Sequence, residues 1–438
     1  MTPAQTGTPS RARLLIVGMI FVAVVINYLD RSNISITVSD IKRAFGFNNE
    51  QMGLVLSGFG WSYAAFQIPG GWVADRVPPR FLYPTILILW SGCTALLGTA
   101  GLLIGSSIAS LFLLRLAVGA LEAPAYSINN QVTTAWFPDR ERGSATGFYI
   151  SGQFVGIAFL TPLLFWIEDS LGWRYVFLFT GGLGVVWGLV WLFVYRSPRK
   201  FRGASAREIA QIEAGGAMVD LGSESGPKAP LTLHDLLEVF RWRKLWGVYI
   251  GQFSVTTAQW FFLTWFPTYL KEYRHFDYSK LGISVGLATS LPFVGAFLGV
   301  LFSGFVSDRI LRAGASLGVA RKTPIIIGLL LSCSIIGANF VDGPWAVIGF
   351  MTLAFFGNGM ASIGWSIISS VAPPRLIGLT GGAFNGISNI SGIVTPYIIG
   401  ALALHGNFAP GLVYVASVAL IGACCYIFVI GKIERVGQ

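Results

Sequence analysis

The chain has 438 residues, of which 54% are hydrophobic and only 11% are charged. A soluble globular protein carries roughly 25% charged residues, and so few charges cannot cover a globular surface. The composition therefore excludes a soluble multidomain enzyme, a disordered or fibrous protein and a disulfide scaffold. It indicates an integral membrane protein, so the net charge of +10 has to be judged by its placement before it is taken as a sign of nucleic-acid binding.

Long apolar runs predict the transmembrane helices, because about 20 apolar residues are needed to cross the hydrocarbon core. The runs are continuously apolar, and an alternating pattern would be needed for a β-barrel. The predicted fold is an all-α integral membrane protein with twelve transmembrane helices. Their expected ranges are 13–36, 50–74, 82–104, 107–135, 144–167, 174–195, 245–270, 281–306, 323–341, 345–371, 377–403 and 408–431.

Lysine and arginine residues divide unevenly between the two sides of this topology. With the N-terminus inside, the inner segments hold 22 of them and the outer segments hold 6. Inner loops of membrane proteins are enriched in these residues. We therefore predict both termini in the cytoplasm, a first helix that is retained and is not a cleaved signal peptide, and no nucleic-acid partner.

One long polar stretch separates six predicted spans from six. We expect an N-terminal bundle at 1–196, a cytoplasmic linker at 197–242 and a C-terminal bundle at 243–438. The linker is expected to contain two short surface helices, because two pairs of residues have capping-box spacing. These pairs are Ser205 with Glu208, and Thr232 with Asp235.

The two halves of the sequence repeat each other. Gly71-Trp-Val-Ala-Asp75-Arg76 after the second span recurs 233 residues later as Gly304-Phe-Val-Ser-Asp308-Arg309, and Thr161-Pro162 recurs 234 residues later as Thr395-Pro396. Parallel repeats of six spans imply two bundles related by a pseudo-two-fold axis along the membrane normal, with a central site between them. We expect a gating role, as a cytoplasmic latch, for Gly71, Asp75, Arg76, Asp308 and Arg309.

Away from their end residues, the predicted spans contain four charged residues, all in the first half: Asp30, Arg31, Arg115 and Glu122. Within the spans of the second half, the corresponding residue is the titratable His405, near the outer end of the eleventh span. Charges inside a bilayer are costly and usually serve a polar cavity. The guanidinium groups suit capture of a carboxylate, and buried carboxylates suit proton coupling by Asp30 and Glu122. The alternative is that two ion pairs, Arg115–Glu122 and Asp30–Arg31, only fix the packing of helices.

The twelve spans, the central linker and the repeated G-x-x-x-D-R motif resemble the major facilitator superfamily, although Pro78 stands where that family usually has Gly. Further motifs resemble its anion:cation symporter family along essentially the whole chain. They are Tyr28-Leu-Asp30-Arg31-Ser-Asn33, Phe66-Gln-Ile-Pro-Gly-Gly-Trp72, Glu122-Ala-Pro124, Trp136-Phe-Pro138, Ser151-Gly-Gln153-Phe, Phe262-Leu-Thr-Trp265-Phe-Pro267 and Ile377-Gly-Leu-Thr-Gly-Gly382.

The resemblance implies a secondary transporter of the bacterial inner membrane. It would import a sugar-acid anion, D-galactonate or a close relative, together with protons by alternating access. Alternatives are another organic anion such as a hexuronate, glucarate or tartrate, an anion exchanger, and a sodium-coupled carrier. We expect a monomer with no cofactor besides the coupling protons. A membrane enzyme or sensor is disfavoured, because the sequence contains no catalytic set, no metal-ligand spacing and no ATP-binding motif.

A polyhydroxy acid also needs neutral hydrogen-bonding groups and an aromatic wall. Six residues within the spans fit these roles, and the resemblance places all of them in the substrate cavity. They are Tyr28, Tyr63, Gln153, Ser362, Trp365 and Asn385. The expected division of labour is anion capture and proton coupling in the first half, and recognition of hydroxyl groups in the second.

Overall fold

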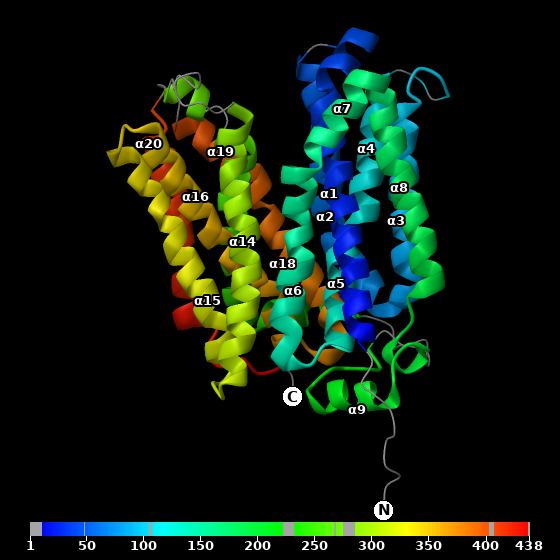
Figure 1. Ribbon diagram of the computed structural model, residues 1–438, viewed down its shortest axis with the longest axis vertical. Coiled ribbons are helices and arrows are strands. Elements are labelled where there is room, and N and C mark those ends of the chain that lie inside the picture. The colour runs from blue at the N-terminus through cyan, green and yellow to red at the C-terminus, as the bar shows by residue number, and fades with distance from the viewer. Residues whose placement is uncertain are drawn as a thin grey trace, which may run out of the picture. The chain divides into compact units, whose positions relative to one another are not determined.

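The computed structural model describes residues 11–47, 49–103, 105, 107–221, 232–266, 269–274, 285–402 and 407–436, which are mostly helical (Figure 1). The residue His405, considered above, lies outside these segments. Within the described chain, eight helical stretches are long and apolar enough to cross a membrane, or nine if the bent pair Asp139–Phe159 and Thr161–Leu171 is one span. The protein is therefore an all-helical, multi-pass membrane protein, and the full number of twelve spans stays a prediction.

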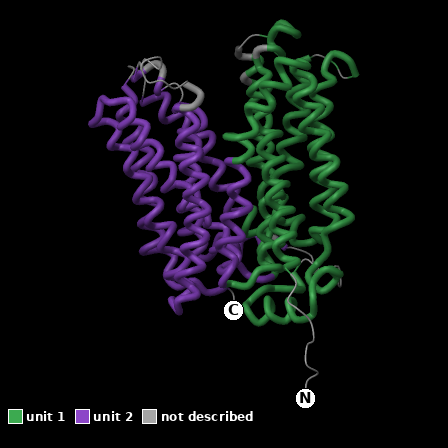
Figure 2. The backbone as a smooth tube through the Cα atoms, in the orientation of Figure 1, with its two compact units in different colours: residues 1–139, 155–231, 375–382 green, residues 140–154, 232–374, 383–438 purple. Residues whose placement is uncertain are grey.

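The chain forms two compact units (Figure 2). Unit 1 comprises Met1–Asp139, Val155–Leu231 and the short segment Arg375–Gly382 from the second half of the chain. Unit 2 comprises Thr232–Pro374 and Ala383–Gln438, together with Arg140–Phe154 from the first half of the chain. Each unit therefore contains a short helical segment from the opposite half of the repeat. The predicted boundaries at 197–242 stay a prediction.

Unit 1 is built around long apolar helices whose backbone hydrogen bonds are made within each helix, as a lipid environment requires. Its elements are α1 (Ala12–Phe45), α2 (Asn49–Arg76), α3 (Pro79–Gly98), α4 (Ile108–Glu122), α5 (Ala125–Trp136), η1 (Val155–Phe159), α7 (Thr161–Leu171), α8 (Trp173–Val194), η2 (Pro198–Lys200) and α9 (Ala206–Ala214).

Unit 2 has the same character. Its elements are α6 (Asp139–Phe154), α10 (Leu233–Arg241), α11 (Arg243–Thr264), η3 (Tyr269–Tyr273), α14 (Val285–Arg312), α15 (Leu317–Ser332), η4 (Cys333–Phe340), α16 (Pro344–Ala361), η5 (Ser362–Gly364), α17 (Trp365–Val371), α19 (Ser391–Leu402), α20 (Ala409–Cys424) and η7 (Cys425–Val429). Three elements contain residues of both units. The helix α6 begins at the last residue of a unit 1 segment, η6 (Pro374–Leu376) passes from unit 2 into unit 1, and α18 (Ile377–Asn389) passes from unit 1 into unit 2.

Proline and glycine shape the interior of unit 1. The predicted span at 107–135 is divided at Pro124 into α4 and α5, because proline has no backbone N–H and clashes with the preceding turn. Gly70 on α2 packs against this break, where a Cβ atom would lie 2.9 Å from the Pro124 ring. Gly156 packs in a similar way against α1, where a Cβ would lie 3.0 Å from that of Tyr28. The break places Glu122 at the end of α4, inside the unit.

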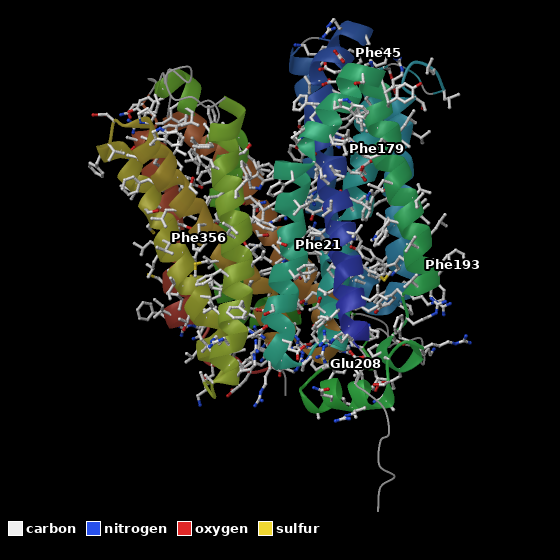
Figure 3. The ribbon with its side chains drawn as sticks, in the orientation of Figure 1. Phe21, Phe45, Phe179, Phe193, Glu208 and Phe356 are labelled. Carbon is white, nitrogen blue, oxygen red and sulfur yellow. The ribbon has the colours of Figure 1, made fainter. Side chains whose placement is uncertain are left out.

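The polar segment after α8 is docked on unit 1. The buried carboxylate of Glu208 on α9 accepts hydrogen bonds from the backbone N–H groups of Ala12 (3.2 Å) and Arg13 (3.4 Å), at the start of α1 (Figure 3). Met218 N–H donates to the carbonyl of Thr134 (3.0 Å). The predicted caps are confirmed, since Ser205 caps α9 and Thr232 with Asp235 forms a capping box on α10. The carboxylate of Glu208 thus stabilises the uncapped end of α1.

Candidate functional site

The charged centre of unit 1 is an ion pair between α1 and α4. Arg31 Nε donates to Glu122 Oε1 at 2.6 Å, and Arg31 Nη2 contacts the same oxygen. Glu122 is fully buried, whereas about a fifth (21%) of the Arg31 side chain is exposed. The other oxygen of Glu122, Oε2, has no hydrogen-bond partner among the described residues. The structure therefore pairs Glu122 with Arg31 and not with Arg115, in contrast to the ion-pair alternative.

Aromatic rings surround this ion pair. The Arg31 guanidinium lies over the rings of Tyr63 (4.5 Å), Tyr28 (4.8 Å) and Phe59 (5.1 Å), measured to the ring centroids. Phe59 and Tyr63 stack on each other at 5.2 Å. Cations favour the negative face of such rings, so the rings help to hold Arg31 in a region of low dielectric. Both predicted tyrosines therefore lie at the ion pair, and Phe59 is an addition that the sequence did not single out.

Arg115 is a buried cation of unit 1 that forms no ion pair with a described carboxylate, although the charge of Glu122 attracts it from a longer distance. Its side chain is 4% exposed and makes no hydrogen bond or ion pair with any described residue. Its guanidinium lies 5.0 Å from the centroid of the Phe59 ring, the same ring that Arg31 contacts. A buried cation without a counter-ion is costly. Such a group is well suited to bind a carboxylate, which can accept two parallel hydrogen bonds from one guanidinium.

Asp30 faces a different set of partners from its neighbour Arg31. It is 1% exposed, and its Oδ2 accepts hydrogen bonds from Trp90 Nε1 (3.1 Å) and Ser91 Oγ (3.4 Å) of α3. Its Oδ1 has no hydrogen-bond partner among the described residues. The Asp30–Arg31 ion pair of the alternative interpretation is therefore not formed. Asp30 and Glu122 share one property, an engaged oxygen beside an unengaged one.

Four of the predicted neutral residues lie in unit 2, Gln153 from the first half of the chain and three from the second half. Gln153, Ser362, Trp365 and Asn385 are all at least nine-tenths buried. The Trp365 ring packs edge-on against Phe384 at 4.8 Å, and Ser362 Oγ donates to the carbonyl of Asn358 at 2.9 Å. Asn389 Nδ2 donates to Asn385 Oδ1 at 3.1 Å. These four positions of unit 2 therefore offer hydrogen-bonding groups and an aromatic ring, and none of them carries a charge.

Two neutral residues of unit 2 were missed by the sequence interpretation. Gln252 on α11 and Tyr426 on η7 are buried, and both the Gln252 Oε1 and the Tyr426 hydroxyl lack a hydrogen-bond partner among the described residues. Both face Gly364, where a Cβ atom would lie 3.1 Å from Gln252 Oε1 and 3.2 Å from the Tyr426 hydroxyl. An amide in an apolar span was the signal that could have identified Gln252.

The repeated Asp residues hold the starts of helices. Asp75 at the end of α2 accepts hydrogen bonds from the backbone N–H groups of Gly378 (2.6 Å) and Leu379 (2.7 Å) of α18. Gln131 Nε2 donates to the same carboxylate at 2.9 Å. Gly71 lies one turn earlier, where a Cβ atom would clash with the carbonyl oxygen of Gly378. The glycine thus permits the close approach, and the carboxylate complements the positive end of the helix dipole.

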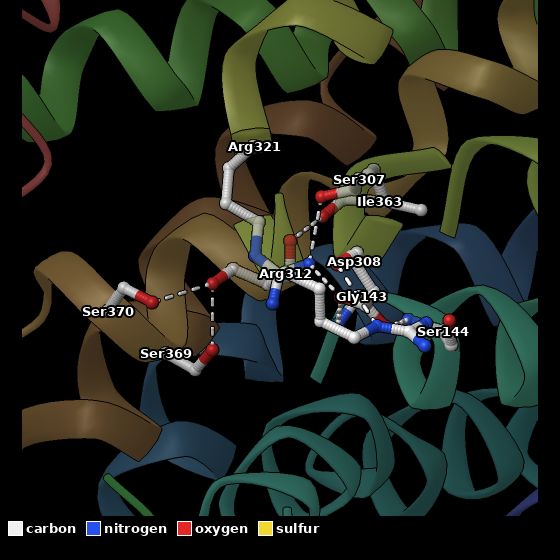
Figure 4. A network of polar contacts seen from close by, with 10 residues as sticks. Gly143, Ser144, Ser307, Asp308, Arg312, Arg321, Ile363, Ser369 and Ser370 are labelled. Carbon is white, nitrogen blue, oxygen red and sulfur yellow. Dashed lines mark hydrogen bonds and ion pairs between the residues drawn. The ribbon is translucent and has the colours of Figure 1, made fainter. Parts of the chain in front are cut away.

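Asp308 makes the equivalent contacts in unit 2 (Figure 4). It accepts hydrogen bonds from the backbone N–H groups of Gly143 (3.1 Å) and Ser144 (2.6 Å) of α6. Arg321 Nη1 of α15 donates to Asp308 Oδ1 at 2.7 Å, and both side chains are 1% exposed. The third partner is therefore a charged arginine here, where Asp75 has the neutral Gln131. Arg321 could not be found from the repeat, because it has no counterpart in the motif.

The arginines of the two motifs do not pair with these carboxylates. The Arg76 guanidinium lies 4.3 Å from the centroid of the Trp72 ring, and that of Arg309 lies 6.0 Å from the Phe305 ring. In each repeat the arginine lies over the aromatic residue four positions earlier. The five predicted latch residues therefore divide into two carboxylates that bind helix starts, a glycine that allows contact, and two arginines held by cation–π contacts.

Metal-ligating residues come together at one place in the described chain. His234, Asp235 and Glu238 on α10 have potential ligand atoms within 4.8 Å of one another. Asp235 already accepts a hydrogen bond from the Thr232 backbone N–H at 2.6 Å. Capping of α10 accounts for this cluster, and we assign no metal to it.

Comparison with known proteins decides the family. The model of the Major Facilitator Superfamily matches residues 20–396. The chain belongs to this superfamily. It is a secondary transporter and not an enzyme, and it fulfils the family expectation drawn from the motifs above.

Its relatives are also transporters. The chain is 49% identical to a D-galactonate transporter of Escherichia coli O6:H1, over 99% of both chains. It is 38% identical to a probable galactarate/D-glucarate transporter, GudP, of Escherichia coli K12, over 98% of this chain and 95% of the relative. The fold is similar to that of the proton:xylose symporter XylE, with a TM-score of 0.73 at 15% identity, covering 96% of this chain and 97% of that structure.

Proposed function

We propose that the protein imports a sugar-acid anion by proton-coupled symport, and that D-galactonate is its substrate. The observation that carries this proposal is the pair of arginines on one aromatic ring, of which Arg115 has no counter-ion among the described residues. An anion that enters this region would give Arg115 the contacting counter-ion that no described residue supplies. The 49% identity to a D-galactonate transporter over nearly the full chain supports the choice of substrate.

The charges of unit 1 support coupling to protons. The four side chains carry no net charge when all are ionised, although neither Asp30 nor Glu122 forms an ion pair with Arg115. A proton on Glu122 weakens its pairing with Arg31 and leaves that guanidinium available to a carboxylate. Binding of the proton and binding of the anion then favour each other, which is the linkage that symport requires.

The membrane potential sets how many protons are useful. A monoanion that enters an inside-negative cell is opposed by about 2.3 kcal/mol per 100 mV. One accompanying proton cancels that charge, and two make entry favourable. Two buried carboxylates, each with an unengaged oxygen, allow a stoichiometry of two.

The remaining expectations complete the proposal. The neutral residues Gln153, Ser362, Trp365 and Asn385 would recognise the hydroxyl groups of the substrate. The protein would have twelve spans in two pseudo-symmetric bundles, act as a monomer and lie in the bacterial inner membrane with both termini in the cytoplasm. The aspartates of the two motifs, Asp75 and Asp308, would act as cytoplasmic latches during alternating access.

Transport by purified protein in proteoliposomes tests this proposal. We expect uptake of labelled D-galactonate under an inward proton gradient in sodium-free buffer, and its loss when a protonophore is added. Uptake that requires sodium, or that persists with protonophore as an exchange against internal anion, would contradict proton symport.

A second candidate is transport of galactarate or D-glucarate, because the GudP relative is 38% identical over nearly the whole chain. These dicarboxylates carry one charge more than galactonate. Competition for labelled galactonate uptake by galactarate, glucarate, glucuronate and tartrate separates the substrates. Half-inhibition by galactarate at a lower concentration than by unlabelled galactonate would favour the second candidate.

A further inference from the structure

A basic cleft lies where the first long helix of unit 2 begins and its last one ends. Its volume is about 580 Å³, and its walls include Trp242, Arg243 and Lys244 at the start of α11 and Phe428, Glu434 and Arg435 after α20. None of these residues belongs to the site described above.

The far wall of the cleft is held in place by the rest of unit 2. Val436 N–H donates to the carbonyl of Val371 at 2.9 Å, and Arg435 Nη1 donates to the carbonyl of Ala372 at 3.1 Å. Lys322 Nζ of α15 donates to the carbonyl of Gly431 at 2.9 Å. The segment after η7 is therefore fixed across the ends of α15 and α17, and the cleft is a feature of the folded unit.

The electrostatic character of the cleft favours an anion. Three cations, Arg243, Lys244 and Arg435, line it against one carboxylate, that of Glu434. Arg243 and Lys244 have no carboxylate partner among the described residues; Arg243 Nη2 reaches only the carbonyl of Phe428, at 3.4 Å. No side chain caps the N-terminus of α11, so its positive end adds to the potential. The buried Trp242 Nε1 also lacks an acceptor in the described chain.

The surroundings of the cleft are apolar and exposed. Phe428 is 70% exposed and Trp246 is 41% exposed, and Leu237 on the adjoining helix α10 is 61% exposed. Trp246 Nε1 donates to the carbonyl of Phe240 at 2.8 Å, which fixes α10 against the start of α11. Aromatic residues at the end of a span and an amphipathic helix beside it are typical of the membrane–water interface. A ligand of this cleft therefore meets cations and apolar side chains together.

We propose that this cleft binds the phosphodiester headgroup of an anionic phospholipid, such as phosphatidylglycerol, with its acyl chains along Phe428 and Trp246. A free phosphate offers the same charge, but it gains nothing from the exposed apolar side chains. Basic pockets at the ends of transmembrane helices are known to recognise anionic headgroups. The proposal depends on membership of the transporter family and not on the identity of the transported anion.

Native mass spectrometry of the full-length protein, titrated with phosphatidylglycerol or phosphatidylcholine, tests this site. The double variant Arg243→Gln/Lys244→Gln is expected to lower the affinity for phosphatidylglycerol about 10- to 30-fold relative to phosphatidylcholine. The matched control, Lys200→Gln/Arg202→Gln, removes the same charge from unit 1 outside the cleft and is expected to leave the affinity unchanged. An equal loss in both variants would overturn the proposal.

Two further measurements distinguish the proposed lipid site from loss of binding through misfolding and from a site for free anions. Glu434→Gln removes the one carboxylate of the cleft from an exposed position, and it is expected to raise the affinity for phosphatidylglycerol about 5-fold. An unchanged or lower affinity would contradict the assignment. Excess inorganic phosphate is expected not to displace the lipid, and full displacement would show a site for free anions instead.

Discussion

Buried charge is distributed in opposite ways in the two compact units. Unit 1 contains Asp30 and Arg31 far from the ends of α1, Arg115 in the middle of α4 and Glu122 at the break between α4 and α5. In the described part of unit 2, the buried charges include Arg142 near the start of α6 and the Asp308–Arg321 ion pair near the adjoining ends of α14 and α15, and the interior positions with candidate site residues are neutral. These four charges of unit 1 are incompletely satisfied, whereas Asp308 is satisfied by two amides and a guanidinium.

This difference separates charges that can change from charges that hold the fold. A carboxylate with an unengaged oxygen can gain a proton without the loss of a helix contact. A carboxylate that holds the start of a helix and a buried arginine cannot lose its charge without leaving the arginine unpaired. We therefore expect substitutions at Asp30, Arg115 and Glu122 to alter transport first and those at Asp308 to alter stability first.

Glu122→Gln is expected to have the largest effect on transport. The amide can still accept the hydrogen bond from Arg31 Nε but cannot carry a proton, so accumulation driven by a proton gradient should fall to the level of passive equilibration. Counterflow in the absence of a gradient should persist in part. Both are measured in proteoliposomes, with Glu213→Gln on the exposed linker as the control. Unchanged accumulation would rule out a coupling role for Glu122.

Asp308→Asn is expected to destabilise the protein by about 3–5 kcal/mol, because it leaves the buried Arg321 without its counter-ion. Thermal unfolding of the detergent-solubilised protein measures this loss. The double variant Asp308→Asn/Arg321→Gln should recover a part of it, since neither charge is then buried alone. A double variant that is as unstable as the single one would show that the ion pair is not the cause.

Arg115→Lys tests anion capture within unit 1. An ammonium group keeps the charge but cannot form two parallel hydrogen bonds with a carboxylate. The loss of one charge-assisted hydrogen bond, about 1.5–3 kcal/mol, corresponds to an increase in the KM for the anion of about 10- to 100-fold. Initial rates of uptake over a range of substrate concentrations measure it. A normal KM would refute bidentate binding at Arg115.

The smallest effect is expected from Asp75→Asn, the counterpart of the Asp308 substitution. Asp75 accepts hydrogen bonds from the neutral Gln131 and from two backbone N–H groups, and an asparagine oxygen can still accept one of them. We expect a loss of about 1–2 kcal/mol in the same unfolding measurement. Equal losses for Asp75→Asn and Asp308→Asn would remove the distinction between the two latches.

Much of the candidate site follows from local features of the sequence. Asp30, Arg31, Arg115 and Glu122 stand out because each is a charge within an apolar run, and Asp75 and Asp308 stand out because the motif repeats. The partners of these residues do not follow in the same way. Asp30 binds Trp90 and Ser91, which look like ordinary members of an apolar helix.

The sequence by itself determined that the protein is a helical membrane protein, that its halves repeat and which charges lie inside it, because hydropathy and spacing are local properties of the chain. Only the tertiary structure decided that Arg31 pairs with Glu122, that Arg115 is left without a counter-ion among the described residues, and that Arg321 joins Asp308. Pairing depends on how each helix is rotated and how deep its residues lie against its neighbours. Those quantities are set by the packing of helices such as α1 against α4, whose paired residues are 91 positions apart in the chain.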